Sequence, residues 1–429
     1  MTILFLLCLF FLLLFLNVPI SFAIGLSTLL FLFTSVDFLP AATTVAQRMT
    51  NGVNSFALMA IPFFILSGQI MAQGGIAKRL INCAMALLGA LPGGLALVNV
   101  LSCTLFGAIS GSAVAATSAI GSFMVPQMKK AGYSAEFSAS VTAAASTTGL
   151  LIPPSNILII YAIASGGVSI SALFLAGYIP GLLVAAALMV FCVIYAKRKG
   201  FATADRLPIK VVLKFVWQAI PSLALIFIVM GGIISGVFTP TEAGAIAVIY
   251  ALVLAAGFYR EVDMQKFGEI LTKTVETTAI VLFLIATSSA LSWVLSYENI
   301  PQDLTDTLLA ISENPLMILL IINLILLLIG AFMDMTPAVL IFTPIFLPIA
   351  VSLGIDPLQF GIMMILNLCI GLCTPPVGAI LFVSCAVSKT KIEKMLKPML
   401  PLYVSMIIVL LMVSVYAPFS TYLPELLAP

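Results

Sequence analysis

The stretch that decides the fold occurs twice in the chain. It reads Gly149-Leu150-Leu151-Ile152-Pro153-Pro154-Ser155-Asn156 in the first half and Gly371-Leu372-Cys373-Thr374-Pro375-Pro376-Val377-Gly378 in the second, at an offset of 222 residues. Each copy lies inside a long apolar run. A Pro-Pro pair removes two amide donors and clashes with the preceding turn, so a continuous helix cannot contain it. We therefore expect a broken helix in each half of the chain.

The composition places these breaks in a membrane. Of the 429 residues, 62% are hydrophobic and only 8% are charged, whereas a soluble domain carries about 25% charged residues. In lipid, a broken helix persists only where protein or a watery cavity satisfies the freed backbone groups. Paired interruptions in corresponding parts of two halves indicate the binding site of a transporter.

The same composition argues against other functions. Histidine is absent, which excludes histidine-based catalysis and histidine metal sites, and the net charge of +2 gives no basis for nucleic-acid binding. No Gly-x-Ser-x-Gly motif, clustered acid pair or Walker motif is present. The sequence therefore predicts that the protein is not an enzyme and does not itself bind ATP.

Two further apolar runs, 92–128 and 315–349, are each long enough for two half-membrane helices. Small or polar residues interrupt them near the middle, at Ser110-Gly111-Ser112 and at Asp334-Met335-Thr336-Pro337. We interpret both as re-entrant hairpins. The predicted fold class is an all-α polytopic membrane protein made of two inverted repeats, each with a re-entrant helical hairpin and a Pro-Pro-broken transmembrane helix.

Charge sets the expected boundaries and topology. The stretch 197–214 is strongly basic, which predicts a cytoplasmic loop, and the acidic loop 298–314 is expected outside. The result is ten crossings with both termini outside. The predicted divisions are a first repeat 1–196 (hairpin 92–128, broken helix 135–165), a cytoplasmic connector 197–214, and a second repeat 215–429 (hairpin 315–349, broken helix 357–388). Three short amphipathic segments are expected along the membrane surface: 76–90, 261–275 and 301–313.

The hairpin tips and the breaks are the candidate sites. Broken helices leave carbonyls and hydroxyls without internal partners, which suits a sodium ion, and half-helix amino ends favour an anion. The first predicted sodium site comprises Ser110, Ser112, Gly149, Ser155 and Asn156. The second comprises Gly330, Asp334, Thr336, Gly371, Thr374 and Gly378. The predicted substrate contacts are Ser110, Ser112, Ser155, Asn156, Thr336 and Arg48.

Structural explanations for these residues stay open. Small residues also pack helices together in lipid, and Arg48 could be an ordinary interfacial anchor. Asp334 is the only acid between Glu313 and Asp356. An intramembrane carboxylate indicates function by default, although it could also fix the hairpin turn through hydrogen bonds.

At these residues the chain resembles the large membrane subunit of tripartite ATP-independent periplasmic (TRAP) transporters. The stretches that carry the resemblance are spread in order over much of the chain: Ala60–Gly68, Leu91–Ala96, Ile109–Ala115, Ile152–Ser155, Phe174–Gly181 and Phe238–Ala245. The hairpin and Pro-Pro arrangement is also similar to the divalent anion/sodium symporters, in which the corresponding positions hold sodium. Val377-Gly378, opposite Ser155-Asn156, departs from this pattern, so the second site depends on backbone oxygens and Thr374.

The resemblance implies a subunit in the bacterial inner (cytoplasmic) membrane that works with a small four-helix membrane subunit. It also implies a periplasmic substrate-binding protein that delivers an organic acid, coupling to two or more sodium ions, no organic cofactor, and an elevator mechanism. The absence of Lys and Arg from the hairpin cores and broken helices suits a hydroxylated monocarboxylate as the substrate. Within the family, the sequence most resembles the sialic-acid branch, and a C4-dicarboxylate is the other type of substrate expected. Alternatives are a sodium/anion symporter without a binding protein, an anion channel, or a membrane scaffold.

Overall fold

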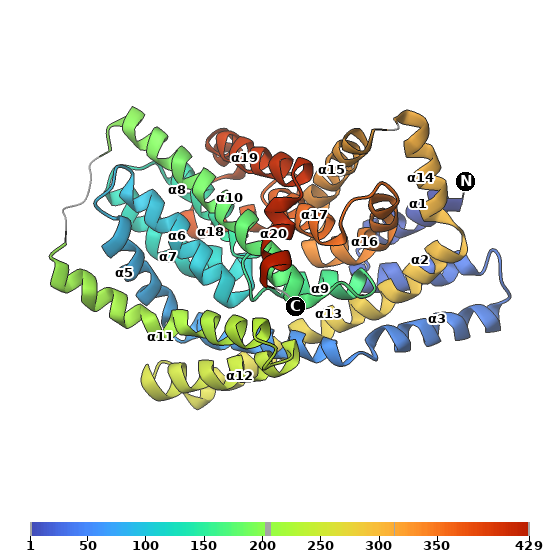
Figure 1. Ribbon diagram of the computed structural model, residues 1–429, viewed down its shortest axis with the longest axis horizontal. Helices are drawn as coiled ribbons and strands as arrows, with labels where there is room; N and C mark the ends of the chain where they lie inside the picture. Colours follow the sequence, from blue (N-terminus) through green and yellow to red (C-terminus); the bar gives the residue numbers. More distant parts are fainter. Residues whose placement is uncertain (1, 202–206, 313, 428–429) are drawn as a thin grey trace.

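The computed structural model describes residues 2–201, 207–312 and 314–427, and within them the chain is helical throughout, with no strand (Figure 1). The middle of the predicted connector, 202–206, and Glu313 lie outside the described residues. The helices of the first half are α1 (Thr2–Phe15), α2 (Ile20–Leu32), α3 (Phe38–Val53), α4 (Ala60–Gln73), α5 (Ile76–Leu88), α6 (Gly94–Ser110), α7 (Ala113–Lys130), α8 (Ala135–Thr148), α9 (Asn156–Ala164) and α10 (Ile170–Lys199).

The second half continues this order. Its helices are α11 (Ile209–Ile234), α12 (Pro240–Leu252, prolonged by a π-helical turn Val253–Phe258), α13 (Met264–Tyr297), α14 (Ile300–Ile311), α15 (Pro315–Phe332), α16 (Met335–Ser352), α17 (Pro357–Gly371), α18 (Ala379–Ser388), α19 (Ile392–Val415) and α20 (Pro418–Leu427). Within the described ranges, eight helices are long and apolar enough to cross a membrane. The protein is therefore an all-α, multi-pass membrane protein.

Both hairpin runs consist of two helices joined by a tight tip. Between α6 and α7 the chain turns at Gly111, whose φ of +61° lies in the left-handed region that favours glycine. Ser112 then caps α7, because its side chain accepts a hydrogen bond from the amide of Ala115 at 3.2 Å. Between α15 and α16 the tip is Met333-Asp334, both in extended conformation, and Asp334 occupies the N-cap position of α16.

Both Pro-Pro stretches separate two short helices. α8 ends at Thr148 and α9 begins at Asn156, and α17 ends at Gly371 and α18 begins at Ala379. Hydrogen bonds satisfy part of the freed backbone, as buried polar groups require. The Ser155 hydroxyl donates to the Leu150 carbonyl at 2.6 Å, and the Val377 amide donates to the Ala331 carbonyl of the second hairpin at 3.1 Å.

Glycines allow each hairpin to cross its broken helix in backbone contact. A methyl group on Gly149 would lie 2.4 Å from the Cα atom of Gly107, and one on Gly371 would lie 2.6 Å from the Cα atom of Gly330. No real side chain tolerates such distances. The same glycine crossing therefore occurs once in each half, beside each hairpin tip.

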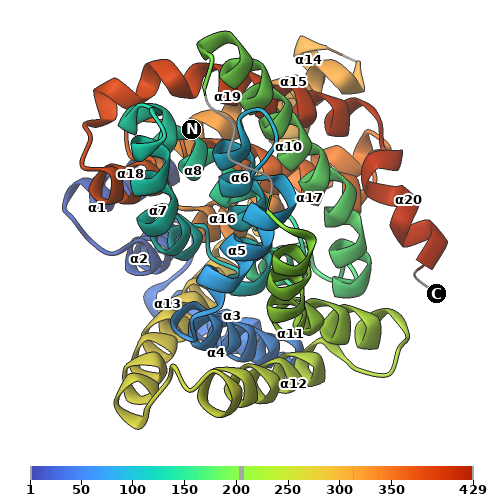
Figure 2. The same cartoon turned by 90° about the vertical axis from the view of Figure 1, so that its left-hand side faces the viewer.

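The hairpins and broken helices of the two halves are packed together. α7 lies against α18 and α16 lies against α9, so each hairpin contacts the broken helix of the other half. Around this central group, α4 packs on α12 and α13, and α13 packs on α2 and α3 (Figures 1 and 2). The hairpin tips and breaks therefore meet near the middle of the molecule.

The structure corrects one element and adds two. The segment 261–275 is not a separate surface helix, because α13 runs without interruption from Met264 to Tyr297. No proline, and only Gly268 near its start, weakens this helix, and its polar first part continues directly into the apolar part. Helices α3 and α20 were not predicted. α3 is amphipathic and packs along α13 (Figure 1).

Candidate substrate and cation site

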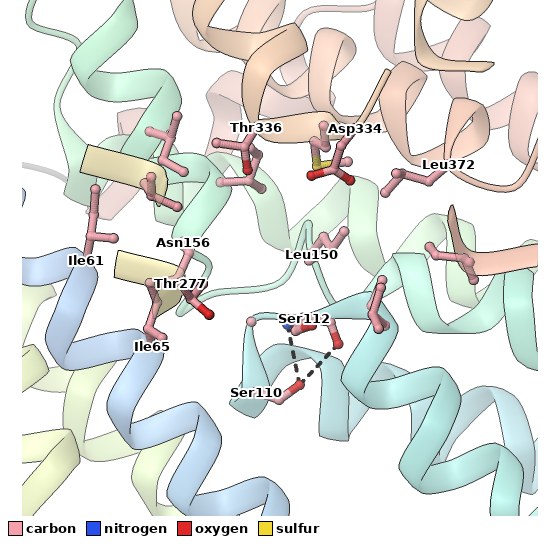
Figure 3. A pocket seen from close by; sticks show the side chains of 18 of the residues that line it. Ile61, Ile65, Ser110, Ser112, Leu150, Asn156, Thr277, Asp334, Thr336 and Leu372 are labelled. Atoms are coloured by element: carbon pink, nitrogen blue, oxygen red, sulfur yellow. Dashed lines mark hydrogen bonds between the residues drawn. The ribbon is translucent and has the colours of Figure 1, made fainter. Parts of the chain in front are cut away.

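A cavity of about 280 Å³ lies where the two hairpin tips meet the two breaks (Figure 3). The tips contribute Ser110 to Val114 and Asp334 to Thr336, and the breaks contribute Leu150, Asn156 and Leu372. Its remaining wall comes from α4, α9, α13 and α18. Residues from both halves of the chain, far apart in sequence, therefore line one space.

Four helices begin at this cavity. Among its lining residues, Ala113, Asn156 and Met335 are the first residues of α7, α9 and α16, and Ile380 is the second residue of α18. An α-helix carries about half a positive charge at its amino end. Four such ends favour an anion in the cavity without any basic side chain.

The first tip presents oxygen atoms with free coordination capacity. The Ser110 hydroxyl and the Ser112 backbone are 3.4 Å apart, a long and weak contact. The Oδ1 atom of Asn156 is buried and has no hydrogen-bond partner among the residues that the structure describes. A buried acceptor of this kind costs free energy unless something binds it. These oxygens are the hard ligands that an alkali cation prefers, so the residues present fit sodium.

The second tip presents a carboxylate. Asp334 is exposed, faces the cavity beside Thr336, and makes no capping hydrogen bond to α16 (Figure 3). Its position at the amino end of α16 partly offsets its charge. The carboxylate is therefore a candidate ligand for a cation in the cavity.

The other predicted residues support the cavity without lining it. Gly149, Gly330 and Gly371 form the two backbone crossings described above. Ser155 and Thr374 are each committed as donors to a carbonyl, Ser155 to Leu150 at 2.6 Å and Thr374 to Ile370 at 2.8 Å. Their hydroxyl oxygens keep lone pairs that a cation could use.

Gly378 and Arg48 complete the predicted set. Gly378 occupies the N-cap position of α18 with a φ of +39°, and a methyl group there would lie 2.9 Å from the Thr374 carbonyl oxygen. Arg48, on α3, is exposed and stacks on Trp293 with its guanidinium carbon 5.1 Å from the ring centre. Arg48 does not line the cavity, so its contact with substrate stays a prediction.

Sequence reasoning missed the wall that α4 and α13 supply. Ile61, Ile65 and Gln69 of α4 line the cavity together with Thr277 and Val281 of α13. Gln69 gave a usable signal, because an amide side chain inside an apolar helix is rare without a function or a partner. The apolar members gave none, since lipid-facing and cavity-facing aliphatic residues look the same in sequence.

The fold and the cavity define a class: a helical membrane protein in which two hairpin tips and two broken helices enclose a central site, an arrangement typical of a membrane transporter. The family described as "Tripartite ATP-independent periplasmic transporter, DctM component" matches residues 7–419. The chain belongs to this family. It is therefore a TRAP transporter large permease subunit and not an enzyme.

Two relatives and one solved structure illustrate the similarity. The chain is 53% identical over 413 residues to the protein named "Uncharacterized protein YgiK" of Salmonella typhimurium, covering 96% of this chain and 95% of that protein. It is 41% identical over 418 residues to the sialic acid TRAP transporter large permease protein SiaM of Vibrio cholerae, covering 96% of each. The crystal structure of the Alcanivorax borkumensis YdaH transporter has a similar fold, with a TM-score of 0.61, 16% identity, and coverage of 91% of this chain and 90% of that one.

Proposed function

We propose that this large permease is the membrane subunit of a sodium-coupled importer for an organic acid anion, with both termini on the periplasmic side of the bacterial inner membrane. The observation that carries the proposal is the central cavity. It collects both hairpin tips, both breaks and four helix amino ends in one place. A site that binds an anion together with cations needs both positive helix ends and free oxygens, and this cavity offers both.

Sodium would bind at the two tips. At the first tip, Ser110, Ser112 and Asn156 would supply side-chain oxygens, with Ser155 and the Gly149 carbonyl behind them. At the second tip the ligand candidates are Asp334, Thr336 and Thr374, together with the carbonyls of Gly330, Gly371 and Gly378. When bound, sodium would supply positive charge that stabilises the substrate and couples its movement to the sodium gradient.

The lining favours one class of substrate. Among the residues that line the cavity, none is Lys or Arg, and the polar groups are mainly hydroxyls and amides. Such a lining suits a monocarboxylate with many hydroxyl groups better than a dicarboxylate, whose second charge would meet Asp334. The 41% identity to a permease named for sialic acid supports this choice.

The mechanism we propose is an elevator that works with two partners. The hairpins and broken helices contact one another across the two halves, which supports their moving as one unit against α4, α12 and α13. We propose that the two halves are inverted repeats, since the order from α4 to α10 recurs from α13 to α19 with a hairpin and a break at the same places. A small four-helix membrane subunit and a periplasmic substrate-binding protein would complete the system, as the tripartite family description supports.

The test is uptake by proteoliposomes that contain the chain and the small subunit, with and without the binding protein. We expect accumulation of a labelled organic acid against its gradient only when an inward sodium gradient and the binding protein are both present. Sodium-driven accumulation without the binding protein would instead identify an ordinary symporter. Downhill, sodium-independent flux would identify a channel.

A further inference from the structure

A second, larger cavity of about 950 Å³ lies between α5, α7, α11 and the turn after α12. Its lining differs from that of the central cavity because it includes basic side chains. It contains the basic side chains Lys78 and Arg79, the amides Gln73, Asn82 and Gln218, and one carboxylate, Glu261. Figure 2 shows α4, α5, α11 and α12 together at this side of the molecule.

Two helices, α4 and α7, line both the central cavity and this second one. On α4, Gln69 lines the central cavity and Gln73, one turn further, lines the second. On α7, Val114 lines the central cavity, and Ser118 and Ser122 follow at helical spacing in the second. Residues four apart lie on one helix face. Successive turns of the same face of α4, and of the same face of α7, therefore line first one cavity and then the other.

The basic pair in the second cavity is partly preorganised. Arg79 donates from Nη1 to the Gly75 carbonyl at 2.8 Å, and its guanidinium carbon lies 3.6 Å from the centre of the Tyr259 ring. These contacts fix the guanidinium plane while other N–H groups remain available. Lys78, the residue directly before Arg79, is exposed. Two cations against one carboxylate leave the cavity with net positive charge.

The corresponding cavity in the other half of the chain is lined by no charged residue among those that the structure describes. There α14 and the second hairpin arm α16 border a cavity of about 320 Å³, and Ser27 is the only polar residue among the described residues that line it. A cavity in this position of the fold can therefore form without charged lining residues. Lys78 and Arg79 mark a feature specific to the gap beside α7.

We propose that Lys78 and Arg79 form a second anion-binding station, which receives the carboxylate of the transported acid after it leaves the central cavity. Arg79 offers paired N–H donors in a plane, the geometry that a carboxylate accepts, and Lys78 adds a mobile ammonium group. Glu261 opposes the anion and keeps its binding weak enough for release. The identity of the anion rests on the proposed function, whereas the station itself rests on the geometry above.

The station contains its own reporter. The chain has two tryptophans, and Trp217 lines this cavity. We would place the full-length Trp293→Phe variant in phosphatidylcholine nanodiscs and titrate it with potassium gluconate, a hydroxylated carboxylate, against potassium chloride at equal ionic strength. We expect a saturable change of Trp217 emission with gluconate only. If Trp293→Phe does not fold, isothermal titration calorimetry of the unsubstituted chain under the same conditions replaces fluorescence.

Charge variants test which groups bind the anion. In Lys78→Gln/Arg79→Gln the half-saturating gluconate concentration should rise about tenfold or more, because charge-assisted hydrogen bonds are lost. Lys129→Gln/Lys130→Gln removes the same charge from the exposed end of α7, away from the cavity. This variant should leave the half-saturating gluconate concentration unchanged. Glu261→Gln should lower that concentration.

Three results would overturn the proposal. The first is an equal loss of gluconate affinity in Lys78→Gln/Arg79→Gln and Lys129→Gln/Lys130→Gln, and the second is a lower gluconate affinity in Glu261→Gln. The third is a change of Trp217 emission with added phosphatidylglycerol but not with gluconate, which would identify a lipid phosphate site. Because these titrations contain no sodium and require no transport, they are independent of the uptake assay. A change of Trp217 emission without uptake would support the second anion-binding station and contradict only the proposed function. Uptake without a change of Trp217 emission would contradict only the station.

Discussion

At the level of single residues, a substitution of Asn156 can distinguish a structural role from a functional one. Its buried Oδ1 atom has no hydrogen-bond partner within the described part of the chain, so replacing Asn156 with the similarly shaped leucine removes an unsatisfied polar group. If the residue served only packing, Asn156→Leu should keep transport and unfold at the same or a higher temperature. We expect instead that the unfolding temperature without sodium is maintained while sodium-driven uptake falls at least about tenfold, the effect of one lost charge-assisted contact. Retained uptake would remove Asn156 from the site.

Asp334 allows a milder substitution. The Asp334 side chain makes no capping hydrogen bond to α16, and asparagine has nearly the same shape and is equally common at N-cap positions, so Asp334→Asn should preserve folding and assembly with the small subunit. We expect it to raise the sodium concentration for half-maximal uptake, because one oxygen of the cavity loses its negative charge. Asp356→Asn is the matched control, since Asp356 caps α17 and does not line the cavity. An unchanged sodium response in well-folded Asp334→Asn would show that the carboxylate only shapes the tip.

The glycine crossings are the corresponding feature at the level of whole elements. Gly149→Ala and Gly371→Ala would each force a methyl group within 3 Å of a facing backbone, so hairpin and broken helix must separate. Overpacking of this kind typically costs about 1–3 kcal/mol, and we expect lower unfolding temperatures for both variants. Gly231→Ala, in the open interior of α11, is the control and should be neutral or slightly stabilising. Equal behaviour of the three variants would mean that the crossings are not tight in solution.

Sequence reasoning located the interruptions well, because their causes are local. A Pro-Pro pair cannot be helical in any context, and the helices do end at both pairs and at both small-residue tips. The all-α, membrane-embedded class is likewise confirmed. The continuity of α13 was missed, since a change from polar to apolar composition does not end a helix. Of the wall from α4, only Gln69 gave a signal in the sequence; the apolar residues Ile61 and Ile65 could not be found, because convergence of distant elements depends on tertiary packing.

At the scale of the whole molecule, the inverted arrangement and both periplasmic termini remain predictions that labelling can test. Labelling positions are best chosen on exposed helical residues, because the middle of the connector, 202–206, lies outside the described residues. Lys199→Cys on α10 and Thr307→Cys on α14 are both exposed. With Cys8 and Cys385 replaced, the other cysteines are buried. We expect an impermeant maleimide to label the two sites from opposite faces of the membrane, and labelling from one face would reject the topology.

The central claim is that one cavity, built from both hairpin tips and both breaks, binds sodium and an organic anion together. The most direct measurement is the initial rate of uptake by the reconstituted chain, with its two partners, as a function of sodium concentration at fixed substrate. Two sodium sites at two tips predict a sigmoidal dependence with a Hill coefficient above one. Uptake at full rate in the absence of sodium would contradict the account.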